Sequence, residues 1–425
     1  MGRVLRVSTE CPSCGGAVEY TEGTNALACG YCGNRHLVTG RRRVLAYRLS
    51  PPGTAPERLA SFYPRRHRCF VPYYRFAAHD LRWELRSRLE RSCVESESGF
   101  PEPGQEADRR EGFFEELRDR YVEKSFLARP ELGRVLPPSL GVRTSVLPAR
   151  PLLDDPALRE AGFLLPTLGL GEARKRAEET PVLDGRILLR RLLAARLAVV
   201  YHPFDFHCEE DGTVRYVVDA VSGSGKSVES ELDVPATESG PPSFETAGLR
   251  PLLCPECGWE LPFRPEDVVF LCGTCHRAWL ALGGEFHRLS YEVLGYGAGE
   301  PVGHLPFWVF ERSGTRTRLY VPAFRYRRLK LLFQLARELS VRAPDFVPVN
   351  SLPRPLGGCH YDAEDALALA QVVYPATKPD VAAGIRELSE LSLSPPRLAW
   401  LPVFGNASLL RSPATGRVLY PALIG

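Results

Sequence analysis

The chain of 425 residues has little lysine and little methionine, with five lysines and a single methionine. Arginine therefore carries almost all of the basic charge, which indicates GC-rich codon usage before it indicates a binding surface. The formal net charge of +3 is too small to identify a nucleic-acid partner by itself. With 44% hydrophobic and 25% charged residues, the composition is that of a globular protein long enough for two or three domains.

The sequence also lacks a long uncharged apolar run. The most apolar long stretch, residues 187–204, contains Arg190, Arg191 and Arg196. This spacing predicts an amphipathic helix and excludes a bilayer-spanning segment. No apolar segment of the kind found in secretory signals precedes Cys11, and Arg6 stands where a myristoylation motif requires Ser or Thr. We therefore expect neither a secretory leader nor a lipid anchor.

Cysteine, in contrast, is plentiful, and eight of the twelve cysteines fall into two sets with one frame. In each set, two CxxC pairs are separated by fourteen residues. Four thiolates at this spacing are typical of the tetrahedral site of a structural zinc ribbon, and the recurrence of the frame makes coincidence a poor explanation. The predicted metal ligands are Cys11, Cys14, Cys29 and Cys32 in the first set, and Cys254, Cys257, Cys272 and Cys275 in the second.

Each set predicts one structural zinc ion, two per chain. A rubredoxin-type iron site is the alternative, because iron also accepts four thiolates in a tetrahedron. The short gap between the pairs favours zinc, and a full set of four cysteines leaves no open position for a catalytic water. His36 and His276 follow the second pair of each set and are expected beside the site or at the surface. Gly15 and Gly33 occupy turn positions that require positive φ.

The four remaining cysteines are scattered along the chain. Thiolate metal sites together with unpaired cysteines indicate a reducing compartment, so we expect a cytoplasmic protein. Two of these cysteines adjoin histidines: Cys208 follows His207, and Cys359 precedes His360. A Cys–His dyad requires adjacency in space, and packing or surface roles are the favoured interpretation. The scattered cysteines are Cys69, Cys93, Cys208 and Cys359.

The residues around the first set resemble the transcription-factor-type zinc ribbons of uncharacterised bacterial proteins. The resemblance is carried by Cys11-Pro-Ser-Cys14-Gly-Gly-Ala-Val and Cys29-Gly-Tyr-Cys32-Gly-Asn. Leu305-Pro-Phe-Trp and Tyr320-Val-Pro-Ala-Phe also resemble strands that follow such ribbons. Some of those proteins carry helicase-like or primosomal names on the ribbon alone. The resemblance covers only the two ribbons and short flanking strands, and no helicase motif is present here, so it does not transfer a nucleic-acid function.

The remaining segments predict an α+β fold rich in strands. A repeated apolar-Pro-aromatic pattern suits strand starts and edges, where proline is tolerated. Hairpins are expected over 198–208 with 214–221, over 305–310 with 316–324, and over 398–404 with 418–424. Helices are expected over 57–63, 111–126, 183–197, 329–341, 363–373 and 381–391.

The order of these segments predicts two halves, each led by a ribbon. We expect a zinc ribbon over 1–40, a β-rich α+β domain over 41–222, a linker over 223–250, a second ribbon over 251–285 and a second α+β domain over 286–425. Because a ribbon followed by a β-rich segment occurs twice, an ancestral duplication is favoured.

Residues 220–227 fit a relaxed P-loop pattern, Ala-Val-Ser-Gly-Ser-Gly-Lys-Ser, with Ala in place of the first Gly. A working P-loop places its amides at the start of a helix. The residues after Lys226 are too few and too polar before Pro235 to form that helix, and no hydrophobic strand ends in a magnesium-binding aspartate. A Gly/Ser turn at a strand end is the favoured interpretation, and no phosphate binding is assigned to residues 223–226.

Closed metal sites, the lack of a complete catalytic motif and the balanced charge favour a non-enzymatic, zinc-stabilised scaffold or adaptor that binds other proteins. The alternative is a nucleic-acid-binding accessory protein that uses the ribbons and the basic segments 65–68 and 325–328. An iron electron carrier and a P-loop enzyme are less favoured.

Overall fold

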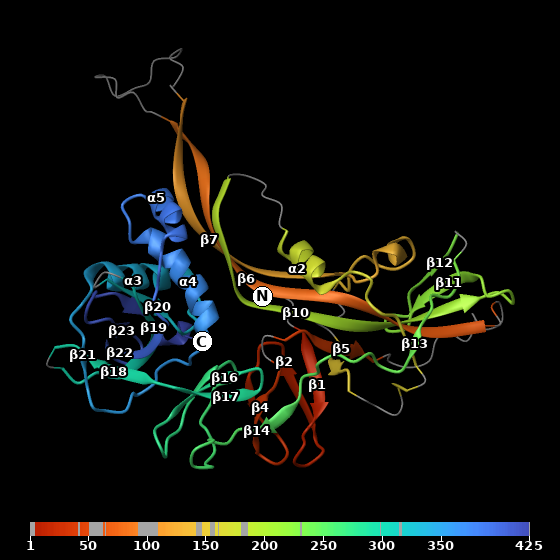
Figure 1. Ribbon diagram of the computed structural model, residues 1–425, viewed down its shortest axis with the longest axis horizontal. Helices are drawn as coiled ribbons and strands as arrows, with labels where there is room; N and C mark the ends of the chain where they lie inside the picture. The colour runs from red at the N-terminus through yellow and green to blue at the C-terminus, as the bar shows by residue number, and fades with distance from the viewer. Residues whose placement is uncertain are drawn as a thin grey trace.

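The structure is a computed structural model that describes residues 5–40, 43–50, 63, 65–91, 109–141, 147–153, 158–159, 161–179, 186–229, 232–297, 299–313 and 317–424. Within these ranges the chain is rich in strands and has few helices, as predicted. An eleven-stranded sheet, a seven-stranded sheet and two three-stranded sheets account for the strands (Figure 1). Each three-stranded sheet holds the second CxxC pair of one cysteine set, and the first pair of the first set lies between β1 (Arg6–Glu10) and β2 (Ala17–Thr21) of the eleven-stranded sheet.

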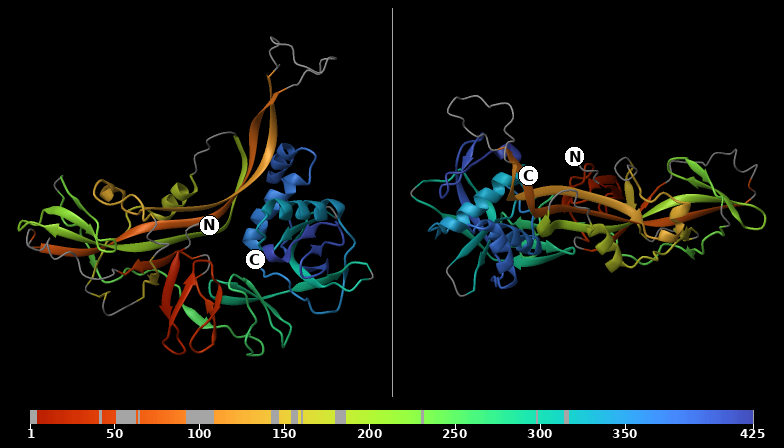
Figure 2. Two further views of the ribbon diagram at one scale, coloured as in Figure 1. Left: turned by 180° about the vertical axis from the view of Figure 1, so that it is seen from behind. Right: turned by 90° about the horizontal axis from the view of Figure 1, so that it is seen from above.

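Three long strands form the centre of the eleven-stranded sheet: β6 (Arg65–Arg91), β7 (Arg109–Leu127) and β10 (Arg186–Cys208). Both β7 and β10 pair antiparallel with β6, one on each side. At about 3.3 Å per residue, the 27 residues of β6 span about 90 Å. Figure 2 shows these strands running along the long axis of the molecule, and the outer end of the β6–β7 hairpin extends beyond the helices of the C-terminal part.

Two predicted helices are wrong, because residues 111–126 lie in β7 and residues 183–197 lie largely in β10. In residues 186–197 of β10 the buried positions are Leu189, Leu193 and Ala194, so burial there does not alternate as it does in a half-buried strand. Pairing with distant strands overrides the helical spacing of both segments. Of the helix predicted over 57–63, residues 57–62 lie outside the described part of the chain.

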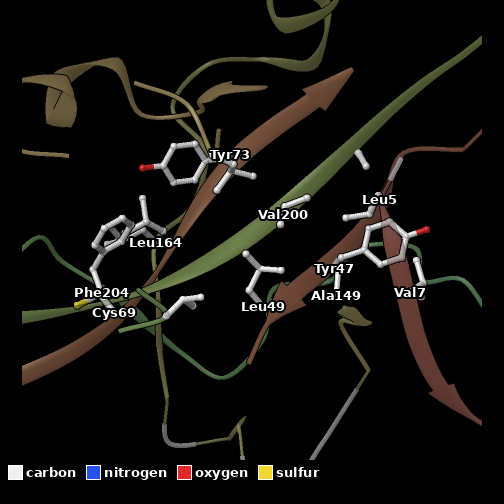
Figure 3. Close-up of a cluster of buried hydrophobic side chains, with 14 of the residues drawn as sticks. Leu5, Val7, Tyr47, Leu49, Cys69, Tyr73, Ala149, Leu164, Val200 and Phe204 are labelled. Atoms are coloured by element: carbon white, nitrogen blue, oxygen red, sulfur yellow. The ribbon is translucent and has the colours of Figure 1, made fainter. Parts of the chain in front are cut away.

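Shorter strands complete this sheet. Next to β10 lie the parallel strand β5 and the antiparallel strand β11, and the predicted β10–β11 hairpin is confirmed. Figure 3 shows the apolar core beneath them, where Leu49 of β5, Tyr73 of β6 and Val200 of β10 lie together. The shorter elements are β1 (Arg6–Glu10), β2 (Ala17–Thr21), β5 (Leu45–Leu49), β8 (Ala149–Pro151), β9 (Gly162–Phe163), β11 (Val214–Asp219), β12 (Gly225–Ser227), β13 (Glu238–Ser239), the helix α2 (Leu170–Glu178) and the 3₁₀ turn η2 (Pro130–Arg134).

Each of the two small sheets holds one CxxC turn between paired strands. The first contains β3 (Ala26–Ala28), β4 (Arg35–Val38) and β14 (Leu249–Pro251). The second contains β15 (Val269–Leu271), β16 (Ala278–Leu282) and β17 (Glu285–Leu289).

The segment 223–250, predicted as a linker, is built into the sheets of the N-terminal half. Strand β12 pairs with β11, β13 pairs with β9, and β14, which begins at Leu249, pairs with β4 of the first ribbon. The segment therefore does not simply separate two independent halves.

The C-terminal part combines the seven-stranded sheet with three helices, and the three helices predicted there are confirmed as α3, α4 and α5. The predicted hairpin of β19 and β20 is also confirmed. The predicted pairing of 398–404 with 418–424 is wrong, because β23 lies between β22 and β24. These elements are β18 (Tyr291–Gly295), β19 (Gly303–Glu311), β20 (Arg318–Pro322), α3 (Leu329–Arg342), β21 (Val347–Pro348), α4 (Ala363–Ala376), α5 (Val381–Arg386), η4 (Glu387–Ser389), β22 (Arg397–Gly405), β23 (Leu410–Arg411), β24 (Val418–Leu419) and η5 (Pro421–Leu423).

The C-terminal part packs directly on the long strands through α4. The indole N–H of Trp83 in β6 donates to the carbonyl oxygen of Val372 at 3.0 Å. Leu81 and Leu193, from β6 and β10, belong to the same apolar cluster as Val373 of α4. Among the described helices, none combines the length and apolarity needed to cross a membrane.

Candidate metal centres

The structure brings together both cysteine sets that the spacing predicted. Within each set, the four Sγ atoms lie within 4.8 Å of one another. The Cys11–Cys32 and Cys14–Cys29 sulfur pairs are 3.8 Å apart, and the Cys254–Cys275 and Cys257–Cys272 pairs are 3.6 Å apart. A tetrahedron with metal–sulfur bonds of about 2.3 Å has sulfur–sulfur edges of about 3.8 Å. Each set can therefore hold one metal ion.

The backbone of each CxxC turn explains how local sequence positions these sulfurs. The amide of Gly15 donates to the carbonyl of Cys11, and that of Gly258 donates to Cys254, both at 2.9 Å. In the other two turns, the amides of Gly33 and His276 donate in the same way to the carbonyls of Cys29 and Cys272. The φ angles are 74° at Gly15, 75° at Gly33 and 75° at Gly258, which confirms the positive φ predicted for the first two. His276 adopts φ 58° at the equivalent position.

Backbone amides also point at one sulfur in each set. The amides of Tyr31 and Thr274 lie 3.4 Å from the Sγ atoms of Cys29 and Cys272. Hydrogen bonds from the amides of Cys32 and Tyr31 lower the pKa of Cys29 to about 6. Burial acts to raise the pKa of Cys272, but the amides of Cys275 and Thr274 outweigh it and lower that pKa to about 7. Thiolate is the form that binds a metal, so each turn favours the metal-binding form of one of its sulfurs near neutral pH.

The two histidines next to the sets differ in position. His36 is buried, and its Nε2 atom lies 3.4 Å from the Sγ atom of Cys11. A neutral ring protonated at Nε2 would donate to that thiolate, which is a common way to hold a metal ligand in place. His276 is exposed and its carbonyl oxygen accepts from the Tyr291 hydroxyl at 3.1 Å. One histidine thus lies beside its site and the other at the surface, the two positions that were expected.

The two ribbons pack against each other, a relationship that the cysteine spacing leaves open. The carbonyl of Pro265 accepts from the amides of Asn25 at 2.6 Å and Ala26 at 3.1 Å. The amide of Leu252 donates to the carbonyl of Arg35 at 2.9 Å. Buried apolar side chains from both ribbons, including Leu37 and Phe270, share one cluster. The two metal centres therefore lie in one packed unit.

Residues 220–227 do not have the geometry of a P-loop. A strand, β12, follows the turn at Gly223 where a P-loop has a helix. The Nζ atom of Lys226 donates to the carbonyl oxygen of Arg134 at 3.1 Å. Without a helix N-terminus at this turn, its amides do not converge on a phosphate site.

Cys208 and His207 are not assembled into a dyad, because neither ring nitrogen of His207 has a hydrogen-bond partner among the described residues. His202 is buried against Asp219, with 2.6 Å between Nε2 and Oδ1. Asp205 accepts two bonds from Arg68, at 2.8 and 2.9 Å. No local sequence pattern marks Asp219, which lies 17 residues from its partner on the neighbouring strand. The hairpin prediction is the one signal that could have paired them.

The second candidate pair also serves the local structure. The Sγ atom of Cys359 lies 3.8 Å from the carbonyl oxygen of Tyr361. The Nδ1 atom of His360 accepts from the amide of Arg325 at 3.0 Å. Both side chains are buried between the second ribbon and the C-terminal sheet. These contacts of Cys359 and His360 are with backbone groups, which is typical of a packing role.

No family model, no curated protein and no solved structure matches the chain. Its function must therefore be argued from the residues and their arrangement alone.

Proposed function

We propose that the chain is a non-enzymatic scaffold or adaptor that is stabilised by two structural zinc ions and binds other proteins in the cytoplasm. The observation that carries the proposal is the position of the two closed cysteine sets at junctions of the fold. Strand β1, just before Cys11, pairs with β8 of the large sheet. The amide of Val268 in the second ribbon donates to the carbonyl of Cys359 in the C-terminal part at 2.7 Å. Metal binding there would contribute its free energy to holding these parts together.

The ligand set supports zinc and a structural role. All four ligands in each set are sulfur, and none of the four positions is left for water or substrate. Rubredoxin-type iron would fit the same tetrahedron, but the short gap between the pairs is more typical of zinc.

The two ribbons also support an origin by duplication. The second CxxC turn of each lies between paired strands, with Ala28 opposite Arg35 in one and Leu271 opposite Ala278 in the other. The strands are therefore joined by turns of equal length. An experimental structure in which the metal-loaded ribbons differ in strand order would contradict a common origin.

Exposed aromatic side chains supply surfaces for a protein partner. On the outer part of β7, Phe113 is 66% exposed, and Phe114 beside it is 41% exposed. On the CxxC turns, Tyr31 is 73% and Trp259 is 65% exposed. Large exposed aromatics are enriched among the residues that anchor protein interfaces, and each of these lies on a strand or next to a cysteine pair.

The nucleic-acid alternative has less support from the basic segments. Arg68 is held by Asp205 through two hydrogen bonds, and Arg325 is paired with Glu266. These two guanidinium groups already have carboxylate partners, which reduces the positive charge that the segments offer to phosphates.

The proposal is tested by affinity capture from cells of the native organism, followed by quantitative mass spectrometry. We compare the natural chain with the double variants F113S/F114S and Y31S/W259S, and use Leu367→Ser on α4, another exposed apolar position, as the matched control. We expect one double variant to recover at least tenfold less of a specific protein partner than the natural chain does. Its metal content and melting temperature should stay unchanged.

Two outcomes would overturn this function. If the natural chain and both double variants recovered every protein equally, the exposed aromatic side chains would not be the sites that bind partners. Recovery that is abolished by nuclease and by moderate salt would favour the nucleic-acid alternative.

A further inference from the structure

A cavity of about 340 Å³ lies where the first ribbon, β10 and α2 meet. Its walls come from the turn after β2, the segment leading into β5, the middle of β10 and the first turn of α2. The volume lies within the range of small-molecule sites. None of its wall residues belongs to a cysteine set, so the cavity is separate from the metal centres.

One arginine of the wall has no ion-pair or hydrogen-bond partner among the described residues. Of its three arginines, Arg43 is paired with Glu245 at 2.8 Å and Arg174 with Glu178 at 3.5 Å. The third, Arg196, is half-buried and has no ion-pair or hydrogen-bond partner in the described part of the chain. Glu22, the acid of the wall, is bound to the fully buried Arg75. Arg196 is therefore available to an anion from solution.

The buried residue Tyr20 lines the same cavity. Tyr20 is 9% exposed, and its hydroxyl has no hydrogen-bond partner among the described residues. Burial raises the pKa of the neighbouring Tyr47 well above its usual value, and the charges of Tyr20, Glu22 and Arg196 act on that group as well. These side chains thus surround one space. Buried polar groups in folded proteins normally have partners, so this hydroxyl is free to donate to a ligand in the cavity.

The first turn of α2 supplies further donors. Leu170 and Gly171 line the cavity, and the N-cap residue Gly169 has no side-chain bond to the helix. The first amides of a helix have no acceptor within it, and together with the helix dipole they favour an anion. A β-carbon added at Gly171 would meet no atom within 4 Å, which shows open space beside this turn.

A bulge in β10 precedes Arg196. The pairing of β10 with β6 shifts register between Leu193 and Arg196, and Ala194 adopts φ 49°. Such bulges re-aim the side chains that follow them, and a non-glycine residue at positive φ is held by its surroundings at a cost. Here the fold maintains an irregular backbone immediately before the unpaired guanidinium.

We propose that this cavity binds a small organic anion with an apolar body. A carboxylate or phosphate group pairs with Arg196, and the Tyr20 hydroxyl and the amides of α2 supply neutral donors around it. The apolar body lies against Leu45, Tyr47 and Leu197 of the wall. Arginine suits this task because its planar fork can bind either oxyanion through two hydrogen bonds.

The proposal is tested by calorimetric titration of the metal-loaded chain with benzoate and with phenyl phosphate. Benzyl alcohol serves as the uncharged analogue and inorganic phosphate as an anion without an apolar body. We expect saturable one-to-one binding of benzoate or phenyl phosphate, with at least tenfold weaker binding of both comparison compounds. The preferred probe shows whether the group recognised is a carboxylate or a phosphate.

Variants assign the binding to this cavity. Arg196→Gln should weaken the preferred probe about tenfold or more, and Tyr20→Phe should weaken it severalfold. Arg215→Gln, which removes an exposed arginine of β11 paired with Glu209 outside the cavity, is the matched control and should leave affinity unchanged.

The proposal is overturned if neither probe binds saturably, if the comparison compounds bind equally well, or if Arg196→Gln binds as the natural chain does. Thermal unfolding of each variant checks that it is folded. Should Arg196→Gln fail to fold, Tyr20→Phe decides the question because it removes one oxygen and keeps the shape of the side chain. An unchanged affinity in that variant would then overturn the site.

Discussion

The backbone amide of Ala194 donates a hydrogen bond of 2.8 Å to the Oδ1 atom of Asp365. The two residues are 171 positions apart, one at the bulge of β10 and the other in the first turn of α4. Both are buried. This bond therefore joins the irregular centre of the large sheet to the C-terminal part of the chain.

Removing the Asp365 carboxylate should destabilise the fold. Asp365→Ala leaves a buried amide without its acceptor, and we expect the free energy of unfolding to fall by about 1–3 kcal/mol. Asp365→Asn keeps an oxygen at that position and should cost less. Urea unfolding measures both changes, with exposed Glu364→Ala as the neighbouring control. If Asp365→Ala and Glu364→Ala were equally stable, the bond to Ala194 would have no energetic role.

The purified chain should be colourless and contain about two zinc ions, one for each four-thiolate set. Cys29→Ser or Cys272→Ser should reduce the content to about one, because each removes a ligand from one tetrahedron. Cys359→Ala changes a buried cysteine outside both sets, so this variant should still contain two zinc ions. Elemental analysis measures the metal content, and the visible spectrum distinguishes colourless zinc from iron. A red protein that contains iron would instead indicate the rubredoxin-type site.

The buried guanidinium of Arg75 predicts unequal effects for its two carboxylate partners. Arg75 is fully buried, with Glu22 at 6% and Glu123 at 16% side-chain exposure. Glu22→Gln should lower the free energy of unfolding by about 3 kcal/mol because it removes the charge that best balances a buried cation. Glu123→Gln should cost less, because solvent reaches that carboxylate more easily.

Glu19→Gln is the matched control for this comparison, since Glu19 lies on β2 of the same ribbon and forms an exposed pair with Arg6. That substitution should change stability by no more than about 0.5 kcal/mol. Chemical denaturation of the three variants compares them directly. Similar losses for Glu19→Gln and Glu22→Gln would show that burial does not set the strength of these pairs.

Stability should depend on pH through Asp267. Burial raises the pKa of this carboxyl to about 6, although the amide of Arg264 donates to its Oδ2 atom at 2.7 Å. The other groups facing it are the nearby Glu266 and the imidazole of His360 beyond Gly358. As pH rises from about 4 to about 6, the unfolded chain releases this proton before the folded chain does. The contribution of Asp267 to stability therefore falls by about 3 kcal/mol across that window.

Asp267→Asn should remove this dependence, so between about pH 4 and about pH 6 it should lose about 3 kcal/mol less stability than the natural chain. Urea unfolding at a series of pH values measures the difference between the two proteins. Glu256→Gln, an exposed position in the same ribbon, should follow the natural chain at every pH. Parallel pH profiles for Asp267→Asn and the natural chain would contradict the assignment.

The helices of the C-terminal part could be predicted because the signals for them are local. Residues 363–373 follow Asp362, whose side chain accepts from the amides of Glu364 and Asp365 at the start of α4. The same kind of periodicity failed for residues 111–126 and 183–197. There the partners are other long strands, such as Leu81 opposite Arg191, more than a hundred positions away in the chain. Helical spacing carries no information about such pairing.

The metal ligands could be identified from spacing because each CxxC turn places two sulfurs through a few backbone bonds within one short segment. The packing of the two ribbons, the pairing of β14 with the first ribbon and the cavity around Arg196 and Tyr20 depend on contacts between distant segments. Cysteine chemistry can be read locally because the residue type and its spacing specify the site. An unpaired arginine becomes informative only when the folded chain shows which carboxylates reach it and which do not.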